Sequence, residues 1–303
     1  MRIAVLSDTR LPTAASFPGH GLGKLALSLA NGLKARGHDV TLFAGKGSAF
    51  DGEIQLFDDE NDYVRATLNF DAMLDITHFH KLQYATGVKA TRIVNVSVDR
   101  EASPGRCAVF PSEHHRKIHQ YTPERARVIP HGVDMPTLKG IKKGTYYAYL
   151  SMFHGPKGPT MAAEAARLAG VELVMAGPTP PVPPPGTRYI GPIFGEEKMY
   201  FLAEAQALIY PASTESAGLV PLEAQAVGTP ALVSAYGGAP EQIIDGKTGL
   251  TARDTLEMGE RIKMCDALKA DDCKTFVREQ RSMAGMIDAY EKALMDVANG
   301  VSW

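Results

Sequence analysis

Two glutamates near the start of an expected helix, Glu215 and Glu223, have the spacing to bind one extended ligand. They lie in the segment ESAGLVPLE, which follows a short apolar run typical of a strand. Pro221 falls in the first turn of the expected helix, where its missing N–H costs nothing. Because Glu215 precedes this helix and Glu223 lies within its first turns, the two carboxylates can address different parts of the same molecule. A carboxylate accepts hydrogen bonds through both oxygens, which suits the paired hydroxyls of a sugar.

The backbone of the same segment offers a site for an anion. N–H groups in the first turn of a helix point outward and favour negative charge, and Gly218 lets a ligand approach the main chain closely. A surface turn followed by an amphipathic helix with ordinary glutamates explains the same residues. On spacing alone, both interpretations stand.

The whole chain has the composition of a globular protein long enough for two domains. It has 303 residues, of which 45% are hydrophobic and 22% charged. The net charge is −2 and the pI is about 6.5. A protein that held nucleic acid mainly through phosphate contacts would usually be basic. A nucleic-acid partner therefore requires a local patch and is not favoured.

The cysteines and the N-terminus indicate a cytoplasmic protein. Three scattered residues, Cys107, Cys265 and Cys273, are too few for a disulfide framework or a zinc site. The N-terminal stretch MRIAVLSDTR predicts a buried strand and lacks the features of a signal peptide. No window approaches the roughly 18 consecutive apolar residues of a membrane span. Any membrane contact is therefore expected to be peripheral.

Apolar runs alternate with helical patterns, which predicts an α/β protein with two parallel sheets. The first strand, helix and strand, within residues 2–44, form one βαβ unit. The alternation restarts after residues 131–143, a polar stretch with Gly and Pro that we interpret as the interdomain linker. Further strands are expected at residues 75–79, 92–96, 107–110, 127–129, 146–150, 171–175, 207–210 and 231–234. Further helices are expected at residues 63–73, 112–121, 160–169, 196–205, 219–227 and 257–268.

These elements divide into an N-terminal Rossmann-like domain at residues 1–137 and a C-terminal one at residues 138–283. A helical segment at residues 284–303 follows, which we expect to cross back to the N-terminal domain. Open parallel sheets bind ligands at the carboxyl ends of their strands. Two such units in tandem are therefore expected to face each other across a cleft that holds the ligands.

The glutamate segment resembles the E-x7-E motif of glycosyltransferase family 4, the retaining GT-B enzymes. The usual family pattern is E-P-F-G-L-V-x-x-E, and this sequence has Ser216-Ala217 in place of the Pro-Phe pair. The resemblance is spread over most of the chain and is strongest toward compact members related to avirulence-type glycosyltransferases. The other matching stretches are Arg36–Val40, Val128–Asp134, Gly228–Pro230, Ala239–Glu241 and Asp245–Gly249.

The resemblance implies a GT-B fold with an acceptor domain followed by a nucleotide-sugar donor domain. Glu223 would bind the ribose hydroxyls of the nucleotide, and Glu215 would face the donor sugar as a catalytic residue. Lys157 matches the family's diphosphate lysine and would act on the leaving group; outside the family context it is an ordinary loop lysine. The backbone contacts to the sugar and the β-phosphate would come from Gly218, Leu219 and Val220.

The resemblance also assigns residues of the N-terminal half. Gly21 and Gly23 lie where the family has a Gly-rich loop near the donor phosphate, although a flexible entry to a helix explains these glycines equally well. His78 and His80 resemble a D-x-x-H-x-H pattern, which makes His80 a catalytic candidate and His78 an acceptor-side candidate. Structural packing at a strand end is the alternative. Two histidines without carboxylate or cysteine partners are poor evidence for a metal.

Two positions depart from the family pattern. Met152 stands where members usually have an arginine that neutralises the diphosphate. Ser97–Arg100 stands where members often have a histidine, which leaves Asp99 as a candidate on the acceptor side.

The resemblance implies a retaining hexosyltransferase that moves a sugar from a nucleoside-diphosphate sugar, with a UDP-sugar favoured, to a hydroxyl acceptor. Such an enzyme works mainly by positioning and by stabilising the departing diphosphate. Neither a metal nor a cofactor is implied, because helix amides and Lys157 can supply that stabilisation. A sugar-nucleotide epimerase and a non-catalytic nucleotide-sugar-binding protein are the alternatives. The acceptor stays open among small metabolites, glycans, lipid-linked sugars and modified nucleic-acid bases.

Overall fold

The computed structural model describes residues 1–14, 21–59, 69–77, 92–97, 106–122, 124–178 and 182–303. The chain forms two compact units, Met1–Pro130 together with Ala284–Trp303, and His131–Met283. The first boundary lies at Pro130–His131, whereas the sequence places it at 137–138. Residues 284–303 group with the N-terminal unit, so the chain passes between the units twice. Among the described residues, no helix is long and apolar enough to cross a bilayer.

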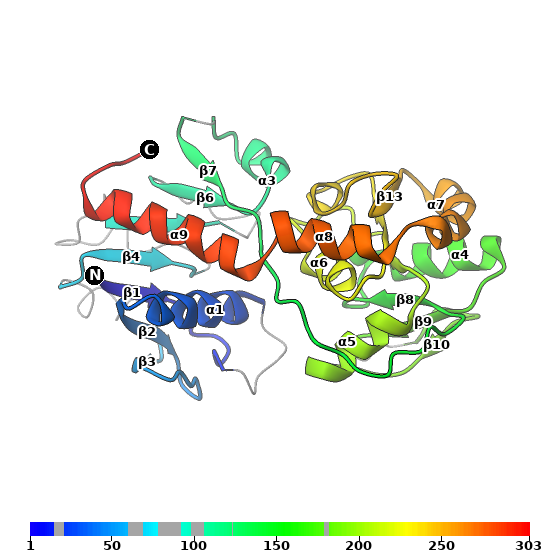
Figure 1. Cartoon of the computed structure of the whole chain (residues 1–303), viewed down its shortest axis with the longest axis horizontal. Helices are drawn as coiled ribbons and strands as arrows, with labels where there is room; N and C mark the ends of the chain where they lie inside the picture. The colour runs from blue at the N-terminus through cyan, green and yellow to red at the C-terminus, as the bar shows by residue number, and fades with distance from the viewer. Residues whose placement is uncertain (15–20, 60–68, 78–91, 98–105, 123, 179–181) are drawn as a thin grey trace. The chain divides into compact units, whose positions relative to one another are not determined.

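The N-terminal unit is built on a parallel sheet with the strand order β3-β2-β1-β4-β5-β6-β7 (Figure 1). The order reverses between β1 and β4, the arrangement of a doubly wound fold. Strand β1 is buried from Ile3 to Leu6, as expected for a strand covered on both faces. The strands are β1 (Arg2–Leu6), β2 (Asp39–Gly45), β3 (Glu53–Phe57), β4 (Ala72–Asp75), β5 (Ile93–Val96), β6 (Ala108–Phe110) and β7 (Ala126–Val128). The helices among the described residues of this unit are α1 (Gly21–Ala35), α3 (Glu113–Ile118) and the C-terminal α9 (Met283–Ala298).

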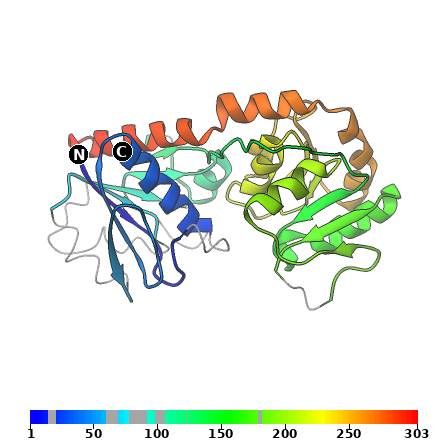
Figure 2. The same ribbon diagram turned by 60° about the horizontal axis from the view of Figure 1, so that its bottom comes forward.

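The C-terminal helix is anchored to the N-terminal unit by packing and by charge, and Figures 1 and 2 show α9 beside α1. Gly32 of α1 makes this possible, because a Cβ there would overlap the side chain of Ile287. His38 Nε2 lies 2.7 Å from the Glu291 carboxylate. Beyond the helix, the Trp303 indole N–H donates to the Ala108 carbonyl at 2.9 Å. These contacts explain why residues 284–303 belong to the first unit.

One predicted strand is wrong in position. The sequence places a strand at residues 75–79, but β4 begins three residues earlier and ends at Asp75. The carboxylate of Asp75 accepts hydrogen bonds from the Thr77 N–H at 2.9 Å and from its hydroxyl at 2.6 Å. This local turn ends the strand. The helix predicted at 63–73 also fails at its end, because Ala72 and Met73 belong to β4.

The C-terminal unit has a second parallel sheet with the order β10-β9-β8-β11-β12-β13. Its strands are β8 (Tyr147–Leu150), β9 (Leu173–Ala176), β10 (Arg188–Tyr189), β11 (Leu208–Tyr210), β12 (Ala231–Ser234) and β13 (Gly249–Ala252). Its α-helices are α4 (Pro159–Ala169), α5 (Gly195–Glu204), α6 (Leu219–Ala226), α7 (Thr255–Arg261) and α8 (Ala270–Gln280). Its described residues also include the 3₁₀ helices η4 (Gly155–Lys157), η5 (Ala239–Gln242) and η6 (Ile262–Ala267). The structure confirms seven predicted elements of this unit to within two residues at each end. They are the strands at 146–150, 171–175, 207–210 and 231–234 and the helices at 160–169, 196–205 and 219–227.

Alternate residues of the second sheet face two different layers of helices. Ala148 and Leu150 of β8 pack with α5 and α6, whereas Tyr147 and Tyr149 pack with α4, α7 and η6. Both faces of the sheet are therefore buried. Ligands then have access to this sheet only at its ends, and the loops after β8, β11 and β12 lie at the carboxyl end where parallel sheets bind ligands.

The stretch interpreted as a linker starts with an anchored residue. The Val133 N–H donates to the Arg281 carbonyl at 2.9 Å, and the Met283 N–H donates to the Val133 carbonyl at 3.1 Å. Gly132 is required beside them, because a Cβ there would overlap the Ser282 backbone. The two passages of the chain between the units are thus tied together at their C-terminal-unit ends.

Candidate functional site

The loop between β11 and α6 carries Glu215 and is the centre of the candidate site. Glu215 Oε1 accepts a hydrogen bond from the Tyr210 hydroxyl at 2.9 Å and forms an ion pair with Lys157 Nζ. The Glu215 side chain is only 11% exposed. Burial, reinforced by the charge of Glu215, raises the pKa of Tyr210 well above its usual value, so Tyr210 stays a donor. Both contacts engage one carboxylate oxygen and leave Oε2 for a ligand.

Lys157 ends the short helix η4, and the surrounding turn is fixed by main-chain contacts. The Tyr149 hydroxyl donates to the Met152 carbonyl at 3.0 Å and lies 3.3 Å from the Lys157 carbonyl. Gly158 follows with φ +66°, and a Cβ there would come within 2.8 Å of the Pro211 ring. A glycine is therefore needed both for the backbone angle and for the close approach to the loop after β11. Lys157 and Glu215, which the sequence analysis assigns to one site, are in direct contact, and their roles at that site stay predictions.

The first turn of α6 presents its backbone without a capping side chain. Gly218 precedes the helix with φ +94°, a region that L-residues rarely adopt. Leu219 and Val220 form the first helical positions. The N–H groups of such a turn have no intrahelical acceptor and favour an anion. This arrangement suits the predicted contact with a phosphate.

Glu223 lies one turn further along α6 and is also paired with a lysine. Its Oε1 forms an ion pair with Lys198 Nζ of α5, and the two side chains are 19% and 14% exposed. Lys198 was missed by the sequence analysis. A signal existed, because Lys198 precedes the buried Phe201 and Leu202 by three and four positions and so lies on the buried face of its helix. A charged residue at such a position requires a partner.

His131 is a second residue near the site that the sequence analysis did not single out. Its side chain is buried, and burial lowers its pKa to about 4 against the opposing effect of the Glu215 charge. Its Nδ1 is buried and has no hydrogen-bond partner in the described part of the chain. His131 is therefore neutral at physiological pH. The sequence shows only the motif VIPHGVD, without indicating that the histidine is buried near Glu215.

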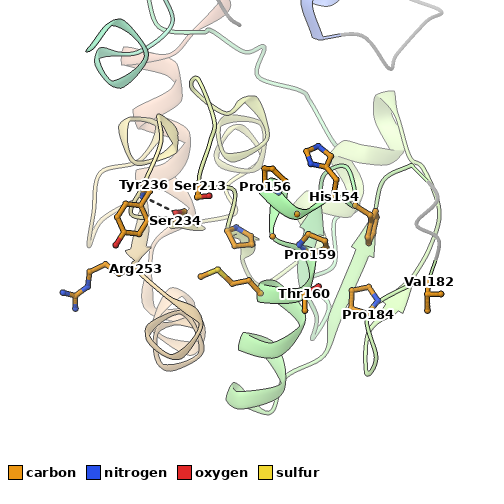
Figure 3. Close-up of a pocket in the computed structure, with 15 residues that line it drawn as sticks. His154, Pro156, Pro159, Thr160, Val182, Pro184, Ser213, Ser234, Tyr236 and Arg253 are labelled. Carbon is orange, nitrogen blue, oxygen red and sulfur yellow. Dashed lines mark hydrogen bonds between the residues drawn. The ribbon is translucent and has the colours of Figure 1, made fainter. Parts of the chain in front are cut away.

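A hollow of about 700 Å³ adjoins the Lys157 turn, and Figure 3 shows it in close-up. It opens at the start of α4, where Pro159 and Thr160 line it. Neither Lys157 nor Glu215 is among its lining residues, although Pro156 and Gly158, on either side of Lys157, are. Met152, where the family arginine was expected, is 50% exposed. The other lining residues include His154, Pro156, Val182, Pro184, Ser213, Ser234, Tyr236 and Arg253.

The structure places only part of the predicted site. Gly21 and Gly23 are the first and third residues of α1, and no described residue would lie within 4 Å of a Cβ added at Gly21. His78, His80 and Asp99 lie outside the described residues. Within the described ranges, no group of three or more His, Cys, Asp or Glu side chains could hold a metal ion.

Residues 184–265 match the family model described as glycosyl transferases group 1. The matched stretch contains Lys198, Glu215, Gly218 and Glu223. Over this segment the chain is similar to glycosyl transferases of group 1. This bears out the resemblance drawn from the E-x7-E motif.

Curated relatives match shorter parts of the chain. A D-inositol 3-phosphate glycosyltransferase of Kribbella flavida is 35% identical over 160 residues, which is 51% of this chain and 32% of that protein. One of the same name from Nocardioides sp. is 30% identical over 164 residues, 48% of this chain and 34% of that protein. Glycogen synthase of Mycobacterium tuberculosis is 42% identical over 79 residues, 25% of this chain and 19% of that protein. The chain thus spans about a third or less of these relatives.

Solved structures match the whole chain. The crystal structure of AviGT4, a glycosyltransferase involved in Avilamycin A biosynthesis, has a TM-score of 0.83 at 19% identity, covering 100% of this chain and 99% of that one. Anabaena Alr3699/HepE in complex with UDP and glucose has a TM-score of 0.74 at 15% identity, covering 98% and 100%. At these identities the likeness shows the fold, and the predicted GT-B fold is confirmed.

Proposed function

We propose that this group 1 glycosyl transferase moves a sugar, with retention, from a nucleoside-diphosphate sugar to a hydroxyl group. The observation that carries the proposal is the pair Glu215 and Glu223, which lie before and after the uncapped start of α6. Each is more than four-fifths buried and forms an ion pair with a lysine. A UDP-sugar is the favoured donor, supported by the UDP and glucose bound to the structural neighbour HepE. The three cysteines are free and buried, which fits the reducing cytoplasm.

In this proposal the acceptor oxygen forms a bond to the anomeric carbon while the bond from that carbon to the β-phosphate oxygen breaks. The acceptor proton passes to the departing phosphate. Negative charge grows on that phosphate, and the backbone N–H groups of Leu219 and Val220 at the start of α6 would stabilise it. Lys157 adds a cation. In the absence of ligand Lys157 forms an ion pair with Glu215. When the donor is bound, the Lys157 ammonium group would therefore interact with both the donor phosphate and the Glu215 carboxylate.

Glu215 would hold the sugar through the carboxylate oxygen that Tyr210 and Lys157 leave open. Glu223 would accept hydrogen bonds from the ribose. The chemical class of the acceptor is open.

A donor screen followed by product analysis tests the proposal. Melting temperatures with UDP-, GDP- and ADP-sugars should identify a donor by its stabilisation of the chain. Mass spectrometry of acceptor mixtures with that donor should then show a glycosylated product together with free nucleoside diphosphate. Interconversion of the sugar nucleotide without an acceptor would indicate an epimerase instead. Binding without turnover across a broad acceptor panel would indicate a non-catalytic protein.

A further inference from the structure

The ion pair between Lys198 and Glu223 joins two helices at the candidate donor site. Lys198 Nζ approaches Glu223 Oε1, and both side chains are more than four-fifths buried. Neither side chain has another hydrogen bond or ion pair with the described residues. The pair therefore engages one oxygen of the carboxylate and leaves Oε2 available to a ligand.

The helix that carries Lys198 is firmly held, which fixes where the ammonium group lies. Phe201 of α5 stacks on Tyr146 with ring centroids 5.6 Å apart. The Tyr146 hydroxyl donates to the Phe201 carbonyl at 2.7 Å. Leu202, one residue on, is fully buried in the core beneath the helix. A lysine on so fixed a backbone can hold a carboxylate in one orientation.

We propose that Lys198 positions Glu223 for the ribose and thereby sets the preference for ribo- over 2′-deoxyribonucleotides. The inference rests on the proposed function, in which Glu223 binds the ribose hydroxyls. By holding Oε1, Lys198 turns Oε2 toward the hydroxyls and offsets the carboxylate charge in a site that receives a neutral sugar ring. Lys198 acts through Glu223 and is thus a positioning residue rather than a catalytic one. A lysine acting on the diphosphate would instead strengthen the binding of ribo- and deoxyribonucleotides equally.

Calorimetric titration of the full chain with matched nucleotide pairs separates these roles. The probe is whichever of UDP, GDP and ADP stabilises the chain most, compared with its 2′-deoxy counterpart. We expect the wild type to prefer the ribonucleotide by about tenfold, the scale of one hydrogen bond to a charged group. Lys198→Met should weaken binding of the ribonucleotide and reduce this preference to less than about threefold. Lys198→Arg, which keeps the charge and the hydrogen-bonding capacity, should restore most of it.

Two further variants act as controls. Lys263→Met removes an exposed lysine of η6 in the same unit and should leave both affinities unchanged. Thermal unfolding of each variant shows that it is folded, and Lys198→Gln replaces Lys198→Met should the latter fail to fold. A ribo-to-deoxy preference that stays at the wild-type value in the Lys198 variants, while both affinities fall together, overturns the proposal.

Glu223→Gln separates this failure from failure of the proposed function. If Glu223→Gln lowers the ribo-to-deoxy preference and the Lys198 variants do not, the ribose assignment stands and only the role of Lys198 is wrong. If Glu223→Gln leaves nucleotide binding unchanged, the ribose assignment is wrong and the role of Lys198 falls with it.

Discussion

Lys157 and Tyr210 meet at the same oxygen of Glu215, one as an ion-pair partner and the other as a hydrogen-bond donor at 2.9 Å. The three residues come from the turn after β8, the end of β11 and the loop that follows it. The carboxylate is thus held at Oε1, whereas Oε2 has no hydrogen-bond partner among the described residues. This asymmetry is what a sugar-binding carboxylate needs, because its hydrogen-bonding direction is set before the ligand arrives.

Glu215→Gln should spare binding of the free nucleoside diphosphate and reduce turnover. Glu215 is proposed to contact the sugar, which the free nucleotide lacks. The amide keeps the shape of the side chain but removes the charge that Lys157 and the sugar hydroxyls require. Titration calorimetry and steady-state kinetics measure the two effects. An equal loss of affinity for nucleotide and nucleotide-sugar would show that the role assigned to Glu215 is wrong.

Lys157→Ala should reduce turnover at saturating donor by at least about a hundredfold, the scale of removing one electrostatic stabiliser of a transition state. Met152 stands where the family has an arginine and carries no charge, so Lys157 has no help from a side chain at that position. Exposed Lys263 provides the matched control, and Lys263→Ala should leave turnover unchanged. Near-normal turnover of Lys157→Ala would mean that other groups hold the diphosphate.

Met152→Arg should be tolerated and should tighten donor binding. Met152 is half exposed, so a longer side chain there costs little packing. The new guanidinium would add a bidentate donor for phosphate oxygens. The Kd of the nucleotide-sugar, measured beside that of the free nucleoside, checks this prediction. Tighter nucleoside binding, or no change in the donor Kd, would contradict it.

His131 should make the protein less stable at acid pH. Its pKa is about 4 in the folded chain and near 6.5 in the unfolded chain, so the unfolded state binds the extra proton first. His131 therefore leaves the free energy of unfolding unaffected above about pH 6.5. As the pH falls toward 4, the free energy of unfolding decreases by about 3 kcal/mol in all. His131→Asn should lose less stability than the wild type over this range. Urea unfolding midpoints at pH 7 and pH 4.5 test this, and parallel losses in the two proteins would refute it.

Local patterns predicted the elements that carry the site better than they predicted the site's contacts. The helix α6 and the strand β11 follow from an apolar run, an early proline and Gly228, which ends the helix with φ +89°. The edge strand β3 was not predicted, because its residues lack a buried face. The pairs Lys157–Glu215 and Lys198–Glu223 join residues far apart in the chain, so no local spacing encodes them.

The most direct test of the central claim, that Glu215 and Glu223 divide a nucleotide-sugar between them, is calorimetry of Glu223→Ala with the nucleoside diphosphate and with the nucleotide-sugar. If Glu223 holds the ribose, both ligands should bind more weakly by the same amount, on the order of 1.5–3 kcal/mol for hydrogen bonds to a charged acceptor. An unchanged Kd for the nucleoside diphosphate would contradict the account.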